Sequence, residues 1–305
     1  MKRAFTYILI TGLVFSCLGL KAQQNKKMSS LEFGFFLGAS NYMGDLTEGL
    51  VPPLNRTGPA LGMLTRFEIN PYWSFKASAI YGRISGSDED YQSDAFRERR
   101  NLSFRSGVFD VSAQLEWNFL GYQSTRSTNA WSPYLFGGLA VFKYNPKAQF
   151  NYVEGLHDPS LASQDGDWVE LQPLGTEGQE TKQFNDRKYY SLTQLAIPFG
   201  FGIKAQLDAN WAIGFEMGFR KTFTDYIDDV STDYVDYQIV RGTHGLLANS
   251  FRDRSEEKGF VPFEDGDVNG PGVARGNEKT KDWYSLTGVT ITYRIYGIKE
   301  KCFQF

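Results

Sequence analysis

The 305-residue sequence contains few of the side chains on which catalytic, metal and disulfide sites depend. It has 2 cysteines, Cys17 and Cys302, and 2 histidines, His157 and His244. Beyond the first 22 residues it also lacks an apolar run long enough for a membrane-spanning helix. If the N-terminal segment is removed, Cys302 is left without an internal partner. A disulfide framework and a bundle of transmembrane helices are therefore excluded.

Residues 1–22 have the composition of a secretory signal peptide. Lys2 and Arg3 are followed by a largely apolar stretch over 5–20, and Ala22 offers a small residue at the cleavage position. Lipidation at Cys17 is an alternative, although the bulky Phe15 suits a lipoprotein cleavage site poorly. We expect a mature chain of residues 23–305 that forms one large β domain.

The mature chain is mildly acidic. Removing three basic residues, Lys2, Arg3 and Lys21, leaves 29 Lys and Arg against 35 Asp and Glu, a net charge of −6. This balance argues against a nucleic acid as the partner.

Eight segments alternate between apolar residues on one parity and glycine, small, polar or charged residues on the other. Behind a secretory signal, this period of two is typical of a membrane-spanning β-barrel. The predicted fold is an eight-stranded antiparallel transmembrane β-barrel in the outer membrane. Its expected strands are 31–42, 58–69, 73–84, 104–119, 132–144, 191–206, 211–221 and 283–296.

The connections between these segments alternate in length. Residues 70–72, 120–131 and 208–210 form short turns, whereas the polar stretches 43–57, 85–103, 145–190 and 222–282 form long loops. Outer-membrane barrels have short periplasmic turns and long extracellular loops. Both termini, including the tail 297–305, are thus expected in the periplasm.

The two parities predict which face of each strand meets lipid. The apolar parity carries no charge, and Trp73, Trp117, Trp131 and Trp211 lie beside the short turns, where an aromatic girdle is expected. The alternative is a soluble barrel or sandwich whose apolar side chains face inward. So many Phe and Trp side chains would not fit inside a barrel of eight strands. The opposite, inward parity carries Glu32, Arg66, Glu68, Lys76, Asp110, Glu116, Lys143, Lys204, Glu216, Arg220 and Arg294.

Two features fit this pattern poorly. In the fifth segment, assigning Tyr134, Phe136 and Phe142 to lipid leaves the apolar Leu135, Leu139 and Val141 on the inner face. In the sixth, Pro198 cannot donate a ladder hydrogen bond, which predicts a bulge.

The inward charges bear on transport. Five acids and six bases in so narrow a barrel are expected to pair across the lumen and fill it, because an unpaired buried charge is costly. We therefore expect a closed barrel. A small outer-membrane pore or ligand channel, in which the charges line water, is one alternative function. A surface enzyme or adhesin built on the loops 145–190 and 222–282 is another.

The remaining chemistry-bearing residues do not form a recognisable site. His157 and His244 each lie in a long loop, and the spacing supplies no positioned partner for a general base. The run Asp225, Asp228, Asp229, Asp233 and Asp236 could bind calcium, but it lacks the ligand spacing and glycine of a calcium loop, and we expect a solvated loop. We predict no enzymatic activity, no catalytic residue, no cofactor and no metal.

Several stretches together resemble PorG-like proteins, outer-membrane β-barrel components of the type IX secretion system of Bacteroidota. They span nearly the whole mature chain: Glu32–Leu46, Arg100–Arg105, Glu170–Gln179, Gln194–Gly200, Lys221–Thr232 and Lys301–Phe305. The resemblance implies an accessory anchor rather than the conduit. Such barrels tie a periplasmic ring, made of a lipoprotein and its partner subunit, to the outer membrane, and in some relatives the system also powers gliding motility.

Cys302 is the candidate for contact with that ring. It lies about six residues past the last expected strand, on the periplasmic side, so its thiol could bond to a cysteine of a ring subunit. The alternative is that Phe305 is the C-terminal aromatic residue read by the barrel-assembly machinery, with Cys302 incidental.

Overall fold

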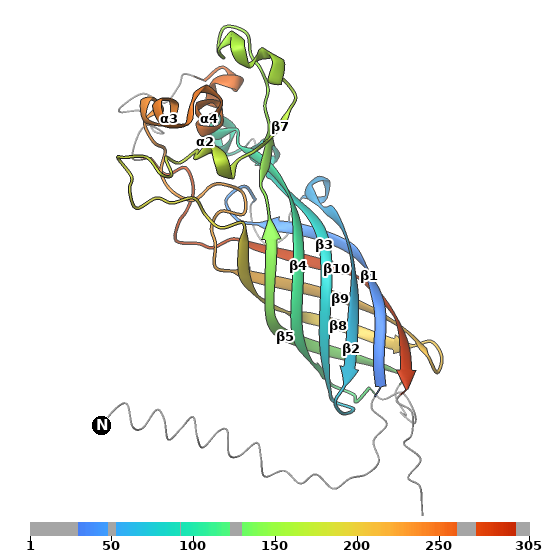
Figure 1. Ribbon diagram of the computed structural model, residues 1–305. Helices are drawn as coiled ribbons and strands as arrows, with labels where there is room; N and C mark the ends of the chain where they lie inside the picture. Colours follow the sequence, from blue (N-terminus) through green and yellow to red (C-terminus); the bar gives the residue numbers. More distant parts are fainter. Residues whose placement is uncertain (1–29, 48–52, 92, 123–129, 261–272, 297–305) are drawn as a thin grey trace, which may run out of the picture.

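A computed structural model describes residues 30–47, 53–91, 93–122, 130–260 and 273–296. The predicted signal peptide and Cys302 lie outside these residues. Within them, eight long antiparallel strands pair in the order β3-β2-β1-β10-β9-β8-β5-β4, and β3 also pairs with β4 (Figure 1). That last pairing closes the sheet into a barrel. No helix in the described ranges is long and apolar enough to cross a membrane.

The eight strands confirm the predicted fold class and lie close to the expected segments. Their bounds are β1 Ser30–Met43, β2 Gly58–Glu68, β3 Trp73–Ser87, β4 Ser103–Asn118, β5 Trp131–Tyr144, β8 Thr193–Gln206, β9 Trp211–Thr222 and β10 Trp283–Tyr296. The tight connections β2–β3 and β8–β9 lie at one end of the barrel, and the long connections lie at the other (Figure 1).

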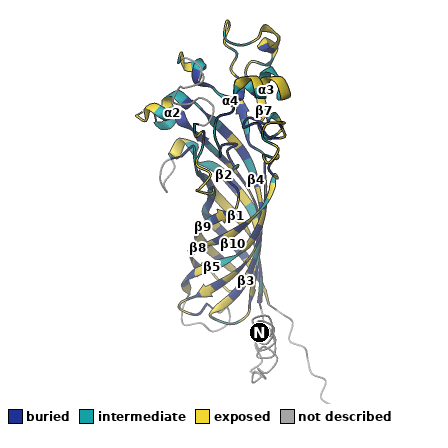
Figure 2. Cartoon of the chain, turned by 90° about the vertical axis from the view of Figure 1, so that its left-hand side faces the viewer, coloured by how far each residue is buried: buried dark blue, intermediate teal, exposed yellow. Residues whose placement is uncertain are grey.

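The outer wall of the barrel is apolar. Exposed and buried residues alternate along the strands, as Figure 2 shows. Trp73, Trp117, Trp131 and Trp211 are 39–49% exposed, next to the short turns, and Trp73 lies opposite Trp117 in the β3–β4 ladder. The exposed apolar parity is the one predicted to face lipid, except in β5.

The predicted phase of β5 is wrong. Tyr134, Phe136 and Phe142 are buried in the barrel, whereas Leu135, Leu139 and Val141 are 44%, 71% and 47% exposed. The lumen accepts these rings because glycines face them: a Cβ on Gly202 would lie 2.5 Å from the ring of Tyr134, and one on Gly200 would lie 2.7 Å from the ring of Phe136. The large aromatic side chains of β5 therefore do not indicate which face of this strand meets lipid.

The bulge predicted at Pro198 is also absent. The β5–β8 ladder pairs Gly137 with Phe199 and then Ala140 with Ala196, so two residues on each strand are unpaired and the register is unchanged. On the other side, Pro198 pairs with Arg220 in register. Because Pro198 has no N–H to donate, the ladder between β5 and β8 is interrupted at this point, and no extra residue is inserted.

The long connections fold into a cap over one mouth of the barrel. Phe150, Leu161, Leu171, Ile227 and Phe251 join the buried apolar cluster that continues into the barrel. The cap contains the short hairpin β6 Lys147–Gln149 and β7 Trp168–Glu170, and the helices α2 Ala95–Arg100, α3 Tyr237–His244 and α4 Leu246–Arg252 (Figure 1). It also contains the 3-10 turns η1 Leu54–Arg56, η2 Asp88–Tyr91, η3 Pro159–Gln164, η4 Gln172–Leu174 and η5 Ser255–Lys258.

The corrected phase of β5 predicts the effect of a charge at Leu139, which lies opposite Ala113 near the middle of the wall. We expect Leu139→Arg to lower the free energy of unfolding in lipid vesicles by about 2–4 kcal/mol, because the guanidinium would enter the hydrocarbon. Denaturant titration of the barrel in vesicles measures this. The control Leu54→Arg, at a side chain 91% exposed on the cap, should be neutral. Equal stability of both variants would contradict the corrected phase.

Candidate functional site: the filled lumen and the loop cap

Glu116 lies at the centre of the charges that fill the lumen. It is completely buried, and its carboxylate accepts hydrogen bonds from Arg66 Nε at 2.8 Å and Lys204 Nζ at 2.8 Å. Lys76 Nζ lies 3.6 Å from Glu116 Oε1 and 2.6 Å from Glu216 Oε2. One carboxylate on β4 thus contacts cations from β2, β3 and β8, which lie on both sides of β4 around the barrel.

A second group of charges joins the first strand to the last. Arg294 of β10 donates to Glu32 of β1 at 2.6 Å and to Glu68 of β2 at 3.0 Å. Arg66 donates to the other oxygen of Glu32 at 2.7 Å. Because Arg66 also binds Glu116, the two groups form one continuous network.

Aromatic rings occupy the space beside these charges. Lys204 Nζ lies 4.8 Å from the ring centres of both Tyr122 and Tyr134, and Lys76 Nζ lies 4.4 Å from that of Phe136. The Tyr134 hydroxyl donates to Glu216 at 2.9 Å. The rings and ion pairs together leave the lumen filled, as the sequence predicted.

Lys143 is the exception among the charges predicted to point inward. With the corrected phase of β5 its side chain is exposed. The other ten predicted charges are buried, and they comprise five acids and five bases. The interior is therefore formally neutral.

The acidic run of the last loop is mostly buried, contrary to the solvated loop that the sequence suggested. Asp225, Asp228 and Asp229 are 1–3% exposed. The Tyr42 hydroxyl, at the top of β1, lies 2.6 Å from Asp228 Oδ2 and 2.8 Å from Asp282 Oδ1. A hydroxyl has one proton to donate, so the second short contact requires a proton on one of the carboxyls.

Glu177 and Arg275 hold the cap together. Glu177 accepts from the backbone N–H groups of Ser231 and Thr232 at 2.9 and 3.0 Å, and Arg275 Nη1 lies 3.0 Å from its carboxylate. Arg275 also donates to the Asp229 carbonyl at 2.6 Å. Three loop segments far apart in the chain therefore meet at one buried ion pair.

The two histidines lie in the cap, and each has a local structural role. His157 Nδ1 accepts from the Val153 N–H at 3.0 Å, and burial lowers its pKa. His244 Nε2 lies 2.8 Å from the Gln179 carbonyl and, as donor, links α3 to that loop.

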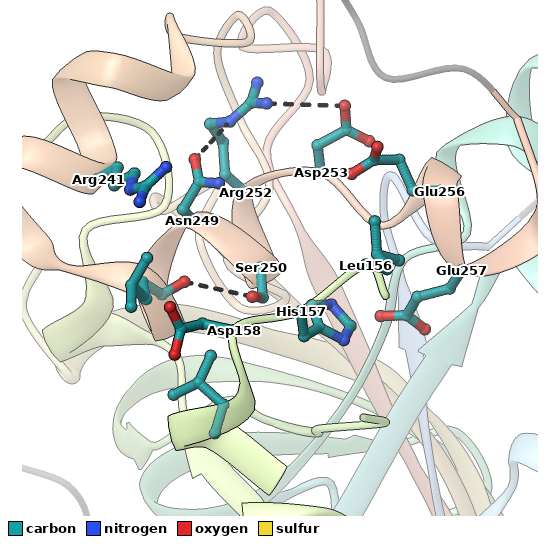
Figure 3. Close-up of a pocket in the computed structure, with 12 residues that line it drawn as sticks. Leu156, His157, Asp158, Arg241, Asn249, Ser250, Arg252, Asp253, Glu256 and Glu257 are labelled. Atoms are coloured by element: carbon teal, nitrogen blue, oxygen red, sulfur yellow. Dashed lines mark hydrogen bonds and ion pairs between the residues drawn. The ribbon is translucent and has the colours of Figure 1, made fainter. Parts of the chain in front are cut away.

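His157 lines a polar pocket of about 290 Å³ between its own loop and α4 (Figure 3). Its neighbours there include Asp158, which caps η3, and Ser250, whose hydroxyl donates to the Leu246 carbonyl at 3.2 Å. Neither side chain is hydrogen-bonded to His157, so the pocket holds no nucleophile paired with a base. Across the described ranges, no group of three or more His, Cys, Asp and Glu residues is arranged to hold a metal ion.

The closed antiparallel sheet with an apolar outer wall and a filled interior defines a transmembrane β-barrel of the eight-stranded, outer-membrane type. The chain belongs to the family described as "Domain of unknown function (DUF6089)", which matches residues 3–160 and 176–250. A search of the curated proteins by sequence found no match.

Among solved structures, the chain is similar to small barrels. Ail of Yersinia pestis matches with 10% identity and a TM-score of 0.36, over 88% of this chain and 97% of that one. The neisserial surface protein NspA matches with 9% identity and a TM-score of 0.36, over 87% of this chain and 96% of that one. The outer membrane protein OprG of Pseudomonas aeruginosa matches with 8% identity and a TM-score of 0.33, over 89% of this chain and 98% of that one. At these scores the likeness adds nothing to what the strand pairing itself establishes.

The buried acids of the cap predict a pH dependence. Burial raises the pKa of Asp225 to about 7 and that of Asp229 to about 6. Burial, together with the neighbouring carboxylate of Asp282, raises the pKa of Asp228 well above its usual value. A raised pKa means that these carboxyls bind a proton more tightly in the folded cap than in the locally unfolded cap. Its stability therefore increases as the pH falls through about 7, and is lost as the pH rises through that value.

Hydrogen exchange of residues 225–231 measures this effect. After correction for the intrinsic exchange rate, we expect stronger protection at about pH 5.5 than at about pH 8, and a smaller difference in Asp225→Asn. Asp186→Asn, at an exposed position of the cap, should behave as wild type. Protection that grows towards alkaline pH would mean that the closed cap holds these carboxyls ionised, contrary to the prediction.

Proposed function

We propose that this chain is a non-enzymatic outer-membrane anchor of the type IX protein secretion machinery, and that it contacts a periplasmic ring of a lipoprotein and its partner subunit. The proposal joins the resemblance of six stretches to PorG-like proteins with one structural observation. That observation is the filled, charge-neutral lumen centred on Glu116.

The filled lumen favours an anchor because it leaves no route for a secreted polypeptide. An eight-stranded barrel has an interior just wide enough for side chains, and here the space holds paired charges and rings. Interactions with other proteins therefore belong at the ends of the strands. At the end that carries the short turns, the tail 297–305 with Cys302 is the part we assign to the ring.

The alternative, a small pore, makes a different prediction in planar bilayers. We expect no stable single-channel current from the wild-type barrel, because ions would have to displace a buried network of ion pairs. The paired variant Phe136→Ala and Tyr134→Ala, which removes two rings from the lumen, serves as the positive control for detecting an opened path. Sizeable, stable currents from the wild type would remove the anchor's main support and favour the pore.

Affinity purification from detergent-solubilised outer membranes tests the partner. We expect a ring lipoprotein and its partner subunit to co-purify with the full chain, and a high-mass species on non-reducing gels that is lost in Cys302→Ser. Cys17→Ser, in the predicted signal peptide, is the matched control. If the ring proteins co-purify without a disulfide-linked species, the bond through Cys302 is refuted and the anchor stands. If no ring protein co-purifies, the anchor itself is refuted.

A further inference from the structure

A cluster of cations lies on the outer face of the barrel, just beyond the apolar wall on the cap side. In the β3–β4 ladder Arg83 lies opposite Gly107, and Arg105 lies opposite Ser85. Lys147 of β6 in turn lies opposite Arg105. Both arginines are exposed and share the outward parity of the apolar wall.

The charges of this cluster are only partly balanced by the protein. Lys147 is paired with Glu170 at 2.8 Å. Neither arginine makes an ion pair with a carboxylate in the described part of the chain. Two neighbouring guanidinium groups of like charge are thus held together without a counter-ion from the protein, which favours an external anion.

Local packing fixes the geometry of the cluster. The guanidinium of Arg105 lies 3.2 Å from the ring centre of Trp168 on β7, a close cation–π contact. A hollow of about 280 Å³ opens between the charges, and it is lined by Tyr81, Arg83, Arg105, Ser106, Gly107, Asn145 and Lys147. Cationic side chains from three strands, Arg83 of β3, Arg105 of β4 and Lys147 of β6, therefore border one space that is large enough for a phosphate.

The position of the cluster relative to the wall points to a lipid. One outward position below Arg83 on β3 is Tyr81, which lies opposite Phe109, and these rings are 42% and 49% exposed. Trp73, in the girdle beside the short turns, and Tyr81 bound nine residues of β3, which is about the length with which a tilted strand crosses the hydrocarbon. The cations beyond them therefore lie at headgroup depth.

Below the rings, the wall itself is hollowed. The outward residues that follow on β3 are Ala79 and Ala77, which are smaller than Tyr81 and Phe75, the outward residues on either side of them. With Met63 and Val111 they line an apolar groove of about 500 Å³ that continues towards Trp211 near the short turns. A groove of this shape in the hydrocarbon zone suits an extended methylene chain.

We propose that this face of the barrel binds a phosphorylated lipid of the leaflet on the cap side. Its phosphate lies between Arg83, Arg105 and Lys147, and one of its acyl chains lies in the groove over Ala77 and Ala79. The site does not depend on the proposed role in secretion. It requires only the barrel in its membrane.

Native mass spectrometry of the full, delipidated protein in detergent tests the site with phosphatidylglycerol as probe. We expect Arg83→Gln combined with Arg105→Gln to weaken binding about twenty-fivefold, since each cation at a membrane surface strengthens binding of an anionic lipid about fivefold. The control, Lys188→Gln combined with Arg241→Gln, removes two exposed cap charges away from the wall and should bind as wild type. Equal binding by the arginine variant would overturn the proposal.

Two further comparisons separate a lipid from a free anion. Diacylglycerol of the same chain length should bind at least tenfold more weakly than phosphatidylglycerol, and glycerol phosphate should bind more weakly still. Ala77→Phe combined with Ala79→Phe fills the groove, and should weaken binding of the long-chain probe while sparing its dihexanoyl analogue. Glycerol phosphate binding as tightly as the long-chain lipid would refute the lipid assignment. All variants are compared as folded barrels, recognised by their compact migration on unheated gels.

Discussion

The neutral charge network inside the barrel is the constraint on which the rest of the structure depends. Leaving one buried charge without its partner costs about 3–5 kcal/mol, so every strand that brings a charge inward must also meet a partner there. Glu116 satisfies cations from three other strands. The same contacts fix the register of the strands around it, because a shift of one residue would turn each charge out into lipid. The same charge pairs therefore fix the register of the strands and fill the lumen.

The cap repeats this arrangement outside the membrane. Its buried polar groups are shared among loops that are distant in sequence, as in the contacts of Tyr42 with Asp228 and Asp282, 186 and 240 residues away. Parts of the stretches that resemble PorG-like proteins meet here. Glu177 belongs to one of them, and it binds the backbone of Thr232, at the end of another. These stretches thus have a structural role in closing the cap, whatever partner the protein has.

The sequence was sufficient to predict the barrel because strands leave a local signal. The period of two places each side chain on a face without reference to any other strand, and it located the strands closely. It failed for β5 because that strand is apolar on both faces. The side of Phe136 is decided by Gly200 and Gly218 on other strands, and neither can be recognised from β5 alone.

The cap could not be predicted for a related reason. Its contacts are long-range, and composition alone cannot distinguish a solvated acidic run from a buried one. The sequence therefore predicts that Asp228 and Asp229 are solvated, although in the structure they face Tyr42 and Tyr190. The cations at the membrane edge were equally hidden, since Lys147 joins Arg105 only through the pairing of β6 with β4.

The ion pair of Glu32 with Arg294 joins residues 262 positions apart and closes the seam between β1 and β10. Until the final strand arrives, Glu32 and Glu68 lack one of their cations and the sheet has two open edges. The pairing of β10 with β1 thus both closes the sheet and completes the neutral interior. A chain truncated before β10 would have two open sheet edges, on β1 and β9, and one uncompensated acid in its interior.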